Sequence, residues 1–236
     1  MVTRRGIGSK LTQNQGFTVW FTGMACTGKS TFASYVAARL RQVGRGVEIL
    51  DENTVGDDLW GQFEDTKEGR TAVVRRLGYV ANLLSRNGAA VLVAAVSPYK
   101  GSREENRRMI GRYVEVYVDC PTEKLIERDT SGKYKKALSG EIPNFIGITE
   151  PYEPPAGPEV SIHSDQESTE EGGRKIFQAL LDLGYVSPED IGIITGKRGK
   201  ATPKALAKGN RKARPAARAA RVAKASKKAA ARRRSR

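Results

Sequence analysis

The sequence has only two cysteines and one histidine in 236 residues, and it has no apolar run as long as a membrane span. Cys26 and Cys120 are too few for a disulfide framework and favour a reducing compartment. The N-terminal residues carry charges but no apolar core of the kind found in secretory signal peptides. We therefore expect a soluble, cytoplasmic protein that does not enter a membrane.

Acidic residues are absent from residues 197–236, which contain 17 of the 41 lysines and arginines. The preceding residues 1–196 carry 24 basic and 26 acidic side chains, so the excess positive charge resides in the tail. This Ala-, Lys-, Arg- and Pro-containing segment resembles the basic tails of linker histones and bacterial histone-like proteins. We expect it to be disordered and to bind nucleic acid or another polyanion without reading sequence. A solubilising extension is the alternative.

A phosphate-binding motif lies near the start of the chain. β-Forming residues at 17–21 precede the spacing G-x-x-x-x-G-K-[ST], and an amphipathic helix follows. Glycines let backbone N–H groups approach phosphate oxygens, and a helix that begins at Lys29 adds its positive dipole end. In such a loop Lys29 contacts the β and γ phosphates of ATP, and the Ser30 hydroxyl binds Mg²⁺. The predicted ATP-binding residues are Gly23, Met24, Ala25, Cys26, Thr27, Gly28, Lys29, Ser30 and Thr31.

Strand and helix patterns alternate through the rest of the body. Further strands are expected at 47–51, 89–96, 113–119 and 159–163, and helices at 29–43, 70–86, 103–112, 122–128 and 170–183. The alternation predicts an α/β protein of the P-loop NTPase fold, with a doubly wound parallel five-stranded sheet and helices on both faces. The kinase domain is predicted to span residues 16–196, after a loose N-terminal arm at 1–15.

Two other segments are expected to cover the site. Residues 52–69 are acidic and weakly periodic, which is typical of a mobile segment over a site or of a surface loop. Residues 128–158 are too polar and proline-rich for a core, and we expect them to form a basic lid over the nucleotides.

Polar residues follow two of the predicted strands. Asp51 ends one strand beside the phosphate loop, and Ser97 follows the apolar run at 89–96. Open α/β sheets bind ligands at the carboxyl ends of their strands. Asp51 is therefore predicted to polarise an acceptor hydroxyl or to orient metal-bound water, and capping of the next helix is the alternative.

Several motifs extend beyond a generic phosphate loop. They are ILD at 49–51, SPY at 97–99, CPTEKLIERD from Cys120, and YKKALSGEIPNFIGITEPYEPP at 134–155. Together they resemble the adenylylsulfate kinases, which use ATP to phosphorylate the ribose 3′-hydroxyl of adenosine 5′-phosphosulfate to give PAPS. The likeness runs from about Gly16 to Tyr185.

The resemblance assigns roles to individual residues. It implies that Phe145 stacks on the substrate adenine, that Arg70 contacts its charged groups, and that the backbone at Ser97 lies near the acceptor. Arg128 is placed with the ATP-binding residues and, together with Lys135 and Lys136, in the lid. The implied substrate-binding set is Arg70, Ser97, Lys135, Phe145 and Ile148, and the implied catalytic set is Lys29, Asp51 and Ser97.

The chain departs from the family pattern in the first substrate-binding segment. Where the family reads Asp-Gly-Asp-Asn-Val-Arg, residues 51–56 read DENTVG. The second carboxylate is thus Asn53, the substrate-binding arginine is Gly56, and the asparagine three residues after Arg70 is Val73.

Three functions remain open from the sequence. The chain is a divergent adenylylsulfate kinase in which Asp51, Glu52 or Asp57 supplies the missing carboxylate, or it phosphorylates another hydroxyl compound. The third alternative is a nucleic-acid-associated protein whose degenerate kinase fold only binds nucleotide. A homodimer is also compatible with the sequence.

Overall fold

A computed structural model describes residues 15–59 and 65–196 of the chain. The described residues belong to one compact unit. The predictions for the N-terminal arm up to residue 14, for residues 60–64 and for the tail at 197–236 lie outside the described residues.

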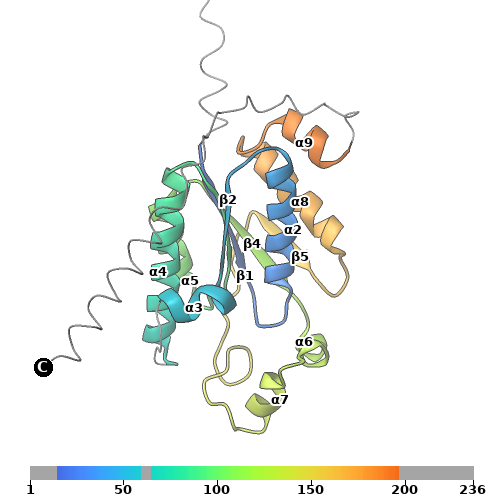
Figure 1. Ribbon diagram of the computed structural model, residues 1–236. Coiled ribbons are helices and arrows are strands. Elements are labelled where there is room, and N and C mark those ends of the chain that lie inside the picture. Colours follow the sequence, from blue (N-terminus) through green and yellow to red (C-terminus); the bar gives the residue numbers. More distant parts are fainter. Residues whose placement is uncertain (1–14, 60–64, 197–236) are drawn as a thin grey trace, which may run out of the picture. The chain divides into compact units, whose positions relative to one another are not determined.

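A five-stranded parallel sheet forms the centre of the domain (Figure 1). Its strands, in the spatial order β2-β3-β1-β4-β5, are β1 (Phe17–Thr22), β2 (Val47–Asp51), β3 (Ala90–Ala94), β4 (Tyr113–Asp119) and β5 (Val160–His163). Because β1 lies between β3 and β4, the loop that follows it emerges among the carboxyl ends of three strands. This is the position where open α/β sheets bind ligands.

Helices cover both faces of the sheet, as the sequence predicted. They are α2 (Lys29–Gln42), α3 (Glu52–Leu59), α4 (Lys67–Arg86), α5 (Lys100–Ile110), α6 (Thr122–Arg128), α7 (Lys133–Leu138), α8 (Thr169–Asp182) and α9 (Pro188–Ile194). Figure 1 shows α4 and α5 on one face and α2 and α8 on the other. It also shows α3, α6 and α7 at the end of the sheet where the loop between β1 and α2 lies.

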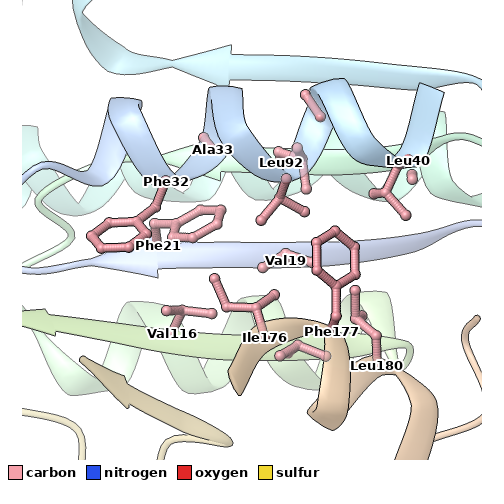
Figure 2. Close-up of a cluster of buried hydrophobic side chains, with 14 of the residues drawn as sticks. Val19, Phe21, Phe32, Ala33, Leu40, Leu92, Val116, Ile176, Phe177 and Leu180 are labelled. Carbon is pink, nitrogen blue, oxygen red and sulfur yellow. The ribbon is translucent and has the colours of Figure 1, made fainter. Parts of the chain in front are cut away.

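Two apolar clusters, one on each face of the sheet, form most of the core, and a smaller third cluster contains Cys120, Leu125 and Tyr134. Val19 and Phe21 of β1 pack with residues of α2 and α8 such as Phe32 and Ile176 (Figure 2). Trp20 points to the opposite face and packs with Leu77 of α4. Successive side chains of a strand alternate between faces, so a strand covered on both sides must be apolar throughout. This explains the unbroken apolar run of β3.

The prediction of an irregular segment over residues 52–69 was wrong for its first part, because α3 occupies Glu52–Leu59. Asp51 starts this helix by accepting the backbone N–H of Asn53 at 2.9 Å, which is the N-cap interaction. The next helix, α4, begins at Lys67, where the Thr66 hydroxyl accepts the N–H of Gly69 at 3.1 Å.

The sequence did not predict α9. Its start is fixed by a capping box between Ser187 and Asp190, with Pro188 in the first turn. Within the described residues, no helix combines the length and apolar character needed to cross a membrane.

Candidate active site

The loop between β1 and α2 adopts a conformation that requires glycine. Gly23 has a φ of 151°, and a Cβ atom there would lie 2.2 Å from the carbonyl oxygen of Val118. Gly28, with a φ of 95°, is the N-cap of α2 and provides no side-chain cap, and the first turn of α2 contains no acidic residue. The first N–H groups of α2 therefore lack the acceptor that a capping side chain would supply, and an anion can take its place.

Lys29 extends over this loop. Its Nζ donates hydrogen bonds to the carbonyl oxygens of Gly23 at 3.0 Å and Met24 at 2.8 Å. Its exposed fraction is 7%. Burial lowers the pKa of the Lys29 ammonium, and the carboxylates of Glu52 and Asp51 act in the opposite direction.

Glu52 is the acidic counterpart of Lys29. Both of its carboxylate oxygens accept the N–H of Val96 at 3.0 Å. Burial raises the pKa of the Glu52 carboxyl, while Lys29 and the N–H of Val96 lower it. A buried lysine and a carboxyl of raised pKa thus influence each other beside the phosphate loop.

A cavity of about 360 Å³ adjoins this pair. It brings together Arg70 from α4, Ser97 from the segment after β3, and Phe145 from the lid. Other charged groups on its wall are Glu52, Asp65 and Lys133, and its apolar wall contains Val73, Val74, Pro98, Ile142 and Ile146. The cavity can therefore hold a molecule that has both an apolar planar part and anionic groups.

Arg70 connects the lid to the start of α4. Its guanidinium forms an ion pair with Asp65 and donates to the carbonyl oxygen of Asn144. The side chain of Asn144 in turn donates to the carbonyl oxygen of Asp65 at 3.1 Å. Among the described residues, the buried Nη1 atom of Arg70 has no hydrogen-bond partner. This donor is available to an anionic ligand in the cavity.

Ser97 lies in a strained part of the backbone. Its φ is 45°, a backbone angle that residues other than glycine rarely adopt, and the residue is almost fully buried. Its hydroxyl accepts the indole N–H of Trp20 at 3.0 Å, and its carbonyl oxygen accepts Nη1 of Arg103 at 2.6 Å. Such conformations cost about 1–3 kcal/mol and persist where surrounding contacts fix them, often at active sites.

The lid packs directly on the phosphate loop. The ring of Phe145 meets the ring of Tyr134 edge-on, with centroids 4.9 Å apart. Tyr134 is fully buried, and its hydroxyl donates to the carbonyl oxygen of Ala25 at 3.0 Å. The lid thereby places Phe145 beside the loop that binds phosphate.

Comparison with known proteins fits this geometry. The family model described as "Adenylylsulphate kinase" matches residues 15–163. The chain belongs to the adenylylsulfate kinase family.

This chain matches two of the relatives named here over nearly their whole length and a third over about a third of its length. The adenylyl-sulfate kinase of Rippkaea orientalis is 46% identical over 175 residues, which is 74% of this chain and 97% of that protein. The structure of the Mycobacterium tuberculosis APS kinase CysC in complex with AMPPNP and APS has a TM-score of 0.67 and 34% identity, over 70% of this chain and 98% of that one. A hexameric APS kinase from Thiobacillus denitrificans has a TM-score of 0.57 and 30% identity, over 75% of this chain and 31% of that one.

Within this adenylylsulfate kinase domain, the predicted catalytic Asp51 and the predicted substrate-binding Lys135 and Ile148 do not line the cavity, and neither does Arg128, which was predicted to bind ATP. Lys135 is exposed on α7 and does not line it, whereas Lys133, two residues earlier, does. Ile148 lines a neighbouring cavity of about 390 Å³. Arg128 donates to the carbonyl oxygen of Ser164 at 2.8 Å.

The segment that departs from the family pattern has a clear arrangement. Oδ1 of Asp51 accepts both the backbone N–H and the side-chain amide of Asn53 at 2.9 Å. Asn53 is exposed and is absent from the cavity wall, while its neighbour Glu52 lines the cavity. The side chain of Asp57 lies outside the described part of the chain. Of the two carboxylates considered from the sequence whose side chains the structure describes, Asp51 and Glu52, it is Glu52 that lines the cavity.

Sequence reasoning missed Lys133 and Arg103. Helical spacing separates Lys133 from Lys135 and Lys136 around α7, but spacing alone does not say which side of the helix borders the cavity. No sequence signal distinguished Arg103 within the charged helix α5.

Proposed function

We propose that this protein transfers the γ-phosphoryl group of ATP to the 3′-hydroxyl of adenosine 5′-phosphosulfate. The observation that carries the proposal is the cavity where Arg70, Ser97 and Phe145 meet from three separate segments, with Glu52, the acidic neighbour of Lys29, on its wall. The Rippkaea orientalis and Mycobacterium tuberculosis relatives, which match over almost their full length, support the same reaction.

The phosphate loop and its surroundings would bind ATP. Backbone N–H groups from Gly23 to Thr31 and the ammonium of Lys29 would stabilise the phosphates, and Lys29 would contact the β and γ groups. Burial and the charge of Asp129 raise the pKa of the Cys26 thiol in this loop, and the nearby charges of Lys133 and Arg128 act in the opposite direction, so these two residues add positive charge on the lid side. We assign Arg128 to ATP binding and Lys133, in place of Lys135, to the cavity.

The site fits a Mg²⁺ ion that is held mainly by the phosphates of a bound nucleotide. Ser30 offers an exposed hydroxyl on the first turn of α2. In the described part of the chain, no group of three or more His, Cys, Asp or Glu residues could hold a metal alone. Mg²⁺ at phosphate sites keeps several waters and takes few protein ligands, so a single hydroxyl suffices. The ion would neutralise charge on the transferred phosphoryl group.

The cavity suits an adenine nucleotide with two anionic groups. The ring of Phe145 would stack on the adenine. The unpartnered Nη1 of Arg70 would donate to the phosphate or sulfate, because a guanidinium binds such groups with charge-assisted hydrogen bonds. Val73, which is buried in the cavity wall, would make an apolar contact where the family pattern has asparagine.

Glu52 would act as the general base. The acceptor hydroxyl gives its proton to the Glu52 carboxylate, its oxygen forms the new bond to the γ phosphorus, and the bond from that phosphorus to the β,γ-bridging oxygen breaks to release ADP. The carboxyl is suited to this task because burial raises its pKa toward neutral pH. Asp51 would act through the backbone, by capping α3 and so fixing the position of Glu52.

A coupled assay of ADP release tests the proposed function. The full chain should release ADP rapidly with adenosine 5′-phosphosulfate and Mg-ATP, and far more slowly with adenosine 5′-monophosphate as the acceptor. Lys29→Ala should abolish turnover and leave the fold intact. Lys124→Ala, which removes an exposed lysine paired with Glu127, should keep full activity. Release no faster than the hydrolysis background, from a folded protein, would reject the proposal.

Another hydroxyl compound as the acceptor is the second candidate, favoured by Asn53, Gly56 and Val73. It predicts that ADP release appears in a screen of hydroxylated metabolites but not with adenosine 5′-phosphosulfate.

The tail forms a separate proposal. Its 17 Lys and Arg residues without an acidic neighbour support non-specific binding of nucleic acid or another polyanion. Residues 1–196 should keep the kinase activity of the full chain and lose salt-sensitive retention on DNA. If the truncated protein retains DNA equally well, the tail is not the binding segment.

Two further expectations concern the cell. The hexameric relative supports self-association of this chain. Our prediction for its oligomeric state in solution is a homodimer. A cytoplasmic location, predicted from the cysteine usage, also stays a prediction.

A further inference from the structure

Arg103 is an almost fully buried arginine at the edge of the proposed site. It lies on α5, its exposed fraction is 2%, and all three guanidinium nitrogens are engaged. Nε donates to Glu115 at 2.9 Å, Nη1 to the carbonyl oxygen of Ser97 at 2.6 Å, and Nη2 to the carbonyl oxygen of Glu153 at 2.6 Å. A guanidinium buried to this degree is rare unless it is fully paired.

The two carbonyl groups belong to segments with different tasks. Ser97 carries the left-handed backbone turn on the cavity wall. Glu153 lies in the segment by which the lid returns to the sheet. The lid segment has its own contacts there, since the N–H of Glu153 donates to the carbonyl oxygen of Pro98 at 2.9 Å, and the Glu153 carboxylate accepts the N–H of Lys100 at 2.8 Å.

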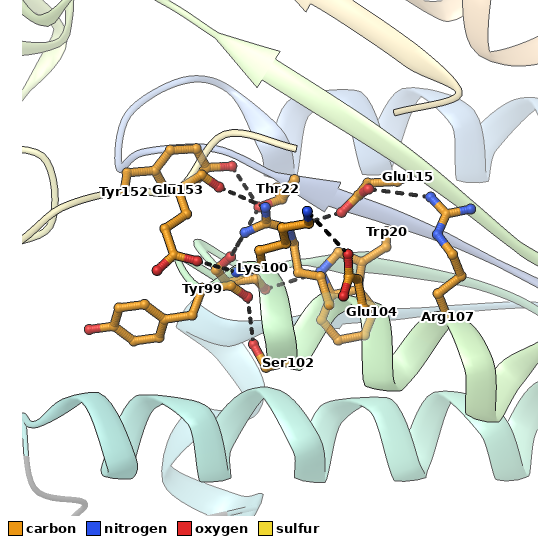
Figure 3. Close-up of polar contacts among 12 residues, drawn as sticks. Trp20, Thr22, Tyr99, Lys100, Ser102, Glu104, Arg107, Glu115, Tyr152 and Glu153 are labelled. Atoms are coloured by element: carbon orange, nitrogen blue, oxygen red, sulfur yellow. Dashed lines mark hydrogen bonds and ion pairs between the residues drawn. The ribbon is translucent and has the colours of Figure 1, made fainter. Parts of the chain in front are cut away.

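Neighbouring aromatic residues hold the same segment. The Tyr152 hydroxyl lies 2.8 Å from the Thr22 hydroxyl, at the end of β1, and the Tyr152 ring stacks on Tyr117. Figure 3 shows Tyr152 and Glu153 at one side of this polar cluster and Glu115 at the other.

The carbonyl oxygens of Ser97 and Glu153 repel each other, and a donor with two N–H groups in a fixed plane can bind both at once. Arginine has this geometry and lysine does not. The charge is balanced by Glu115, which lies at 7% exposure on β4 and also accepts Nη2 of Arg107 at 3.3 Å. Arg103 is thus anchored on the sheet while its outer nitrogens reach the two segments.

We propose that Arg103 is a positioning residue that holds the Ser97 turn and the returning lid segment at a fixed separation, and so shapes the acceptor side of the cavity. The proposal rests on the proposed function for its kinetic readout. It also predicts a change in backbone protection that is measured without any substrate. Arg103 does not line the cavity, so its effect acts through Ser97 and Glu153.

The test compares variants that separate positioning from stability. Arg103→Met removes the guanidinium and leaves the buried Glu115 carboxylate with Arg107 as its ion-pair partner. The double variant Arg103→Met, Glu115→Gln also removes the charge of Glu115, which protects the fold. The matched control is Arg107→Gln. Arg107 lies on the same helix and pairs with Glu115 and Glu159, and no contact joins it to Ser97 or Glu153 among the described residues.

In both Arg103 variants we expect the KM for adenosine 5′-phosphosulfate to rise at least tenfold, kcat to fall, and the KM for ATP to stay within twofold. In the same proteins without substrate, hydrogen exchange of the Glu153 amide should accelerate at least tenfold. Arg107→Gln should lower Tm but leave both readouts unchanged.

Unchanged exchange at Glu153 in the folded double variant would overturn the proposal, as would equal effects from Arg107→Gln. If the wild-type protein does not phosphorylate adenosine 5′-phosphosulfate, the proposed function fails, and the exchange result alone decides on Arg103.

Discussion

Replacement of Glu52 by glutamine tests the assignment of the general base. Glu52→Gln keeps the size of the side chain and an oxygen that can accept the N–H of Val96, so the wall of the cavity should remain in place. The substitution removes two properties only, the ability of the side chain to take a proton and its negative charge near Lys29. Its effect should therefore fall on the chemical step.

The size of the effect follows from the reaction type. A positioned general base contributes about 10²–10⁴-fold to rate. Phosphoryl transfer passes through a loose transition state in which the hydroxyl proton moves late, which favours the lower part of that range. We expect kcat to fall roughly 10²–10³-fold, or about 3–4 kcal/mol of barrier. The KM for ATP should not rise, because the substitution removes a negative charge that would repel the ATP phosphates near Lys29.

The pH dependence gives a second readout. Burial raises the Glu52 pKa, so wild-type kcat should fall as the pH drops through that raised value, and this acidic limb should be missing in Glu52→Gln. A raised pKa also means that the fold favours the neutral carboxyl. Its contribution to stability is complete below the unfolded-state pKa and is lost as pH rises through the folded-state pKa. At pH 8 the glutamine variant should therefore unfold at the same or a higher temperature than the wild type.

The assay is coupled ADP release between pH 5 and 9, together with thermal unfolding. Glu48→Gln on β2, at an exposed position, is the matched control and should behave as wild type. A kcat within threefold of wild type, with the acidic limb intact, would refute the role of Glu52. Asn53→Asp in the Glu52→Gln background then shows whether a carboxylate at the usual family position restores activity.

Three further predictions follow from single contacts. Arg70→Ala should raise the KM for the acceptor about 10–100-fold and change the KM for ATP little, because a charge-assisted hydrogen bond contributes about 1.5–3 kcal/mol. Arg75→Ala, on the same helix, is the control and should leave both KM values unchanged. Burial, followed by the charge of Asp129, raises the pKa of the Cys26 thiol. Iodoacetamide should therefore modify Cys26 more slowly than free cysteine at pH 7.5, and bound ATP should slow the modification further. Modification faster than that of free cysteine would contradict the raised pKa. Gly23→Ala should destabilise the fold by about 2 kcal/mol or more in urea unfolding, because its Cβ would overlap the Val118 carbonyl, whereas Gly46→Ala, with open space around it, should change stability little.

The phosphate loop was predictable because its requirements are local. A strand, two glycines, a lysine and a serine at fixed offsets define a backbone path and the start of α2 without reference to the rest of the chain. The all-apolar β3 and the alternating helices similarly indicated a parallel sheet covered on both faces, which the structure confirms. The motifs from Ser97 and Tyr134 indicated the family, which the comparisons also show.

Local composition misled the prediction for residues 52–59. The segment ENTVGDDL contains glycine and several polar residues, which argue against a helix, yet Asp51 caps it and Val55 packs against the core cluster of α4. Packing and a good N-cap outweighed weak helix propensity.

The sequence by itself determined the loop that holds phosphate, the sheet that supports it, and the family. Only the tertiary structure decided that Glu52 rather than Asp51 lines the cavity, which lysine of the lid reaches it, and that Arg103 links Ser97 to the lid. These facts depend on contacts between a side chain and a distant backbone group, such as Glu52 with Val96, 44 residues apart, and Arg103 with Glu153, 50 residues apart. Spacing along the chain specifies local backbone geometry, but contacts between distant segments are set by how helices and loops pack on the shared sheet.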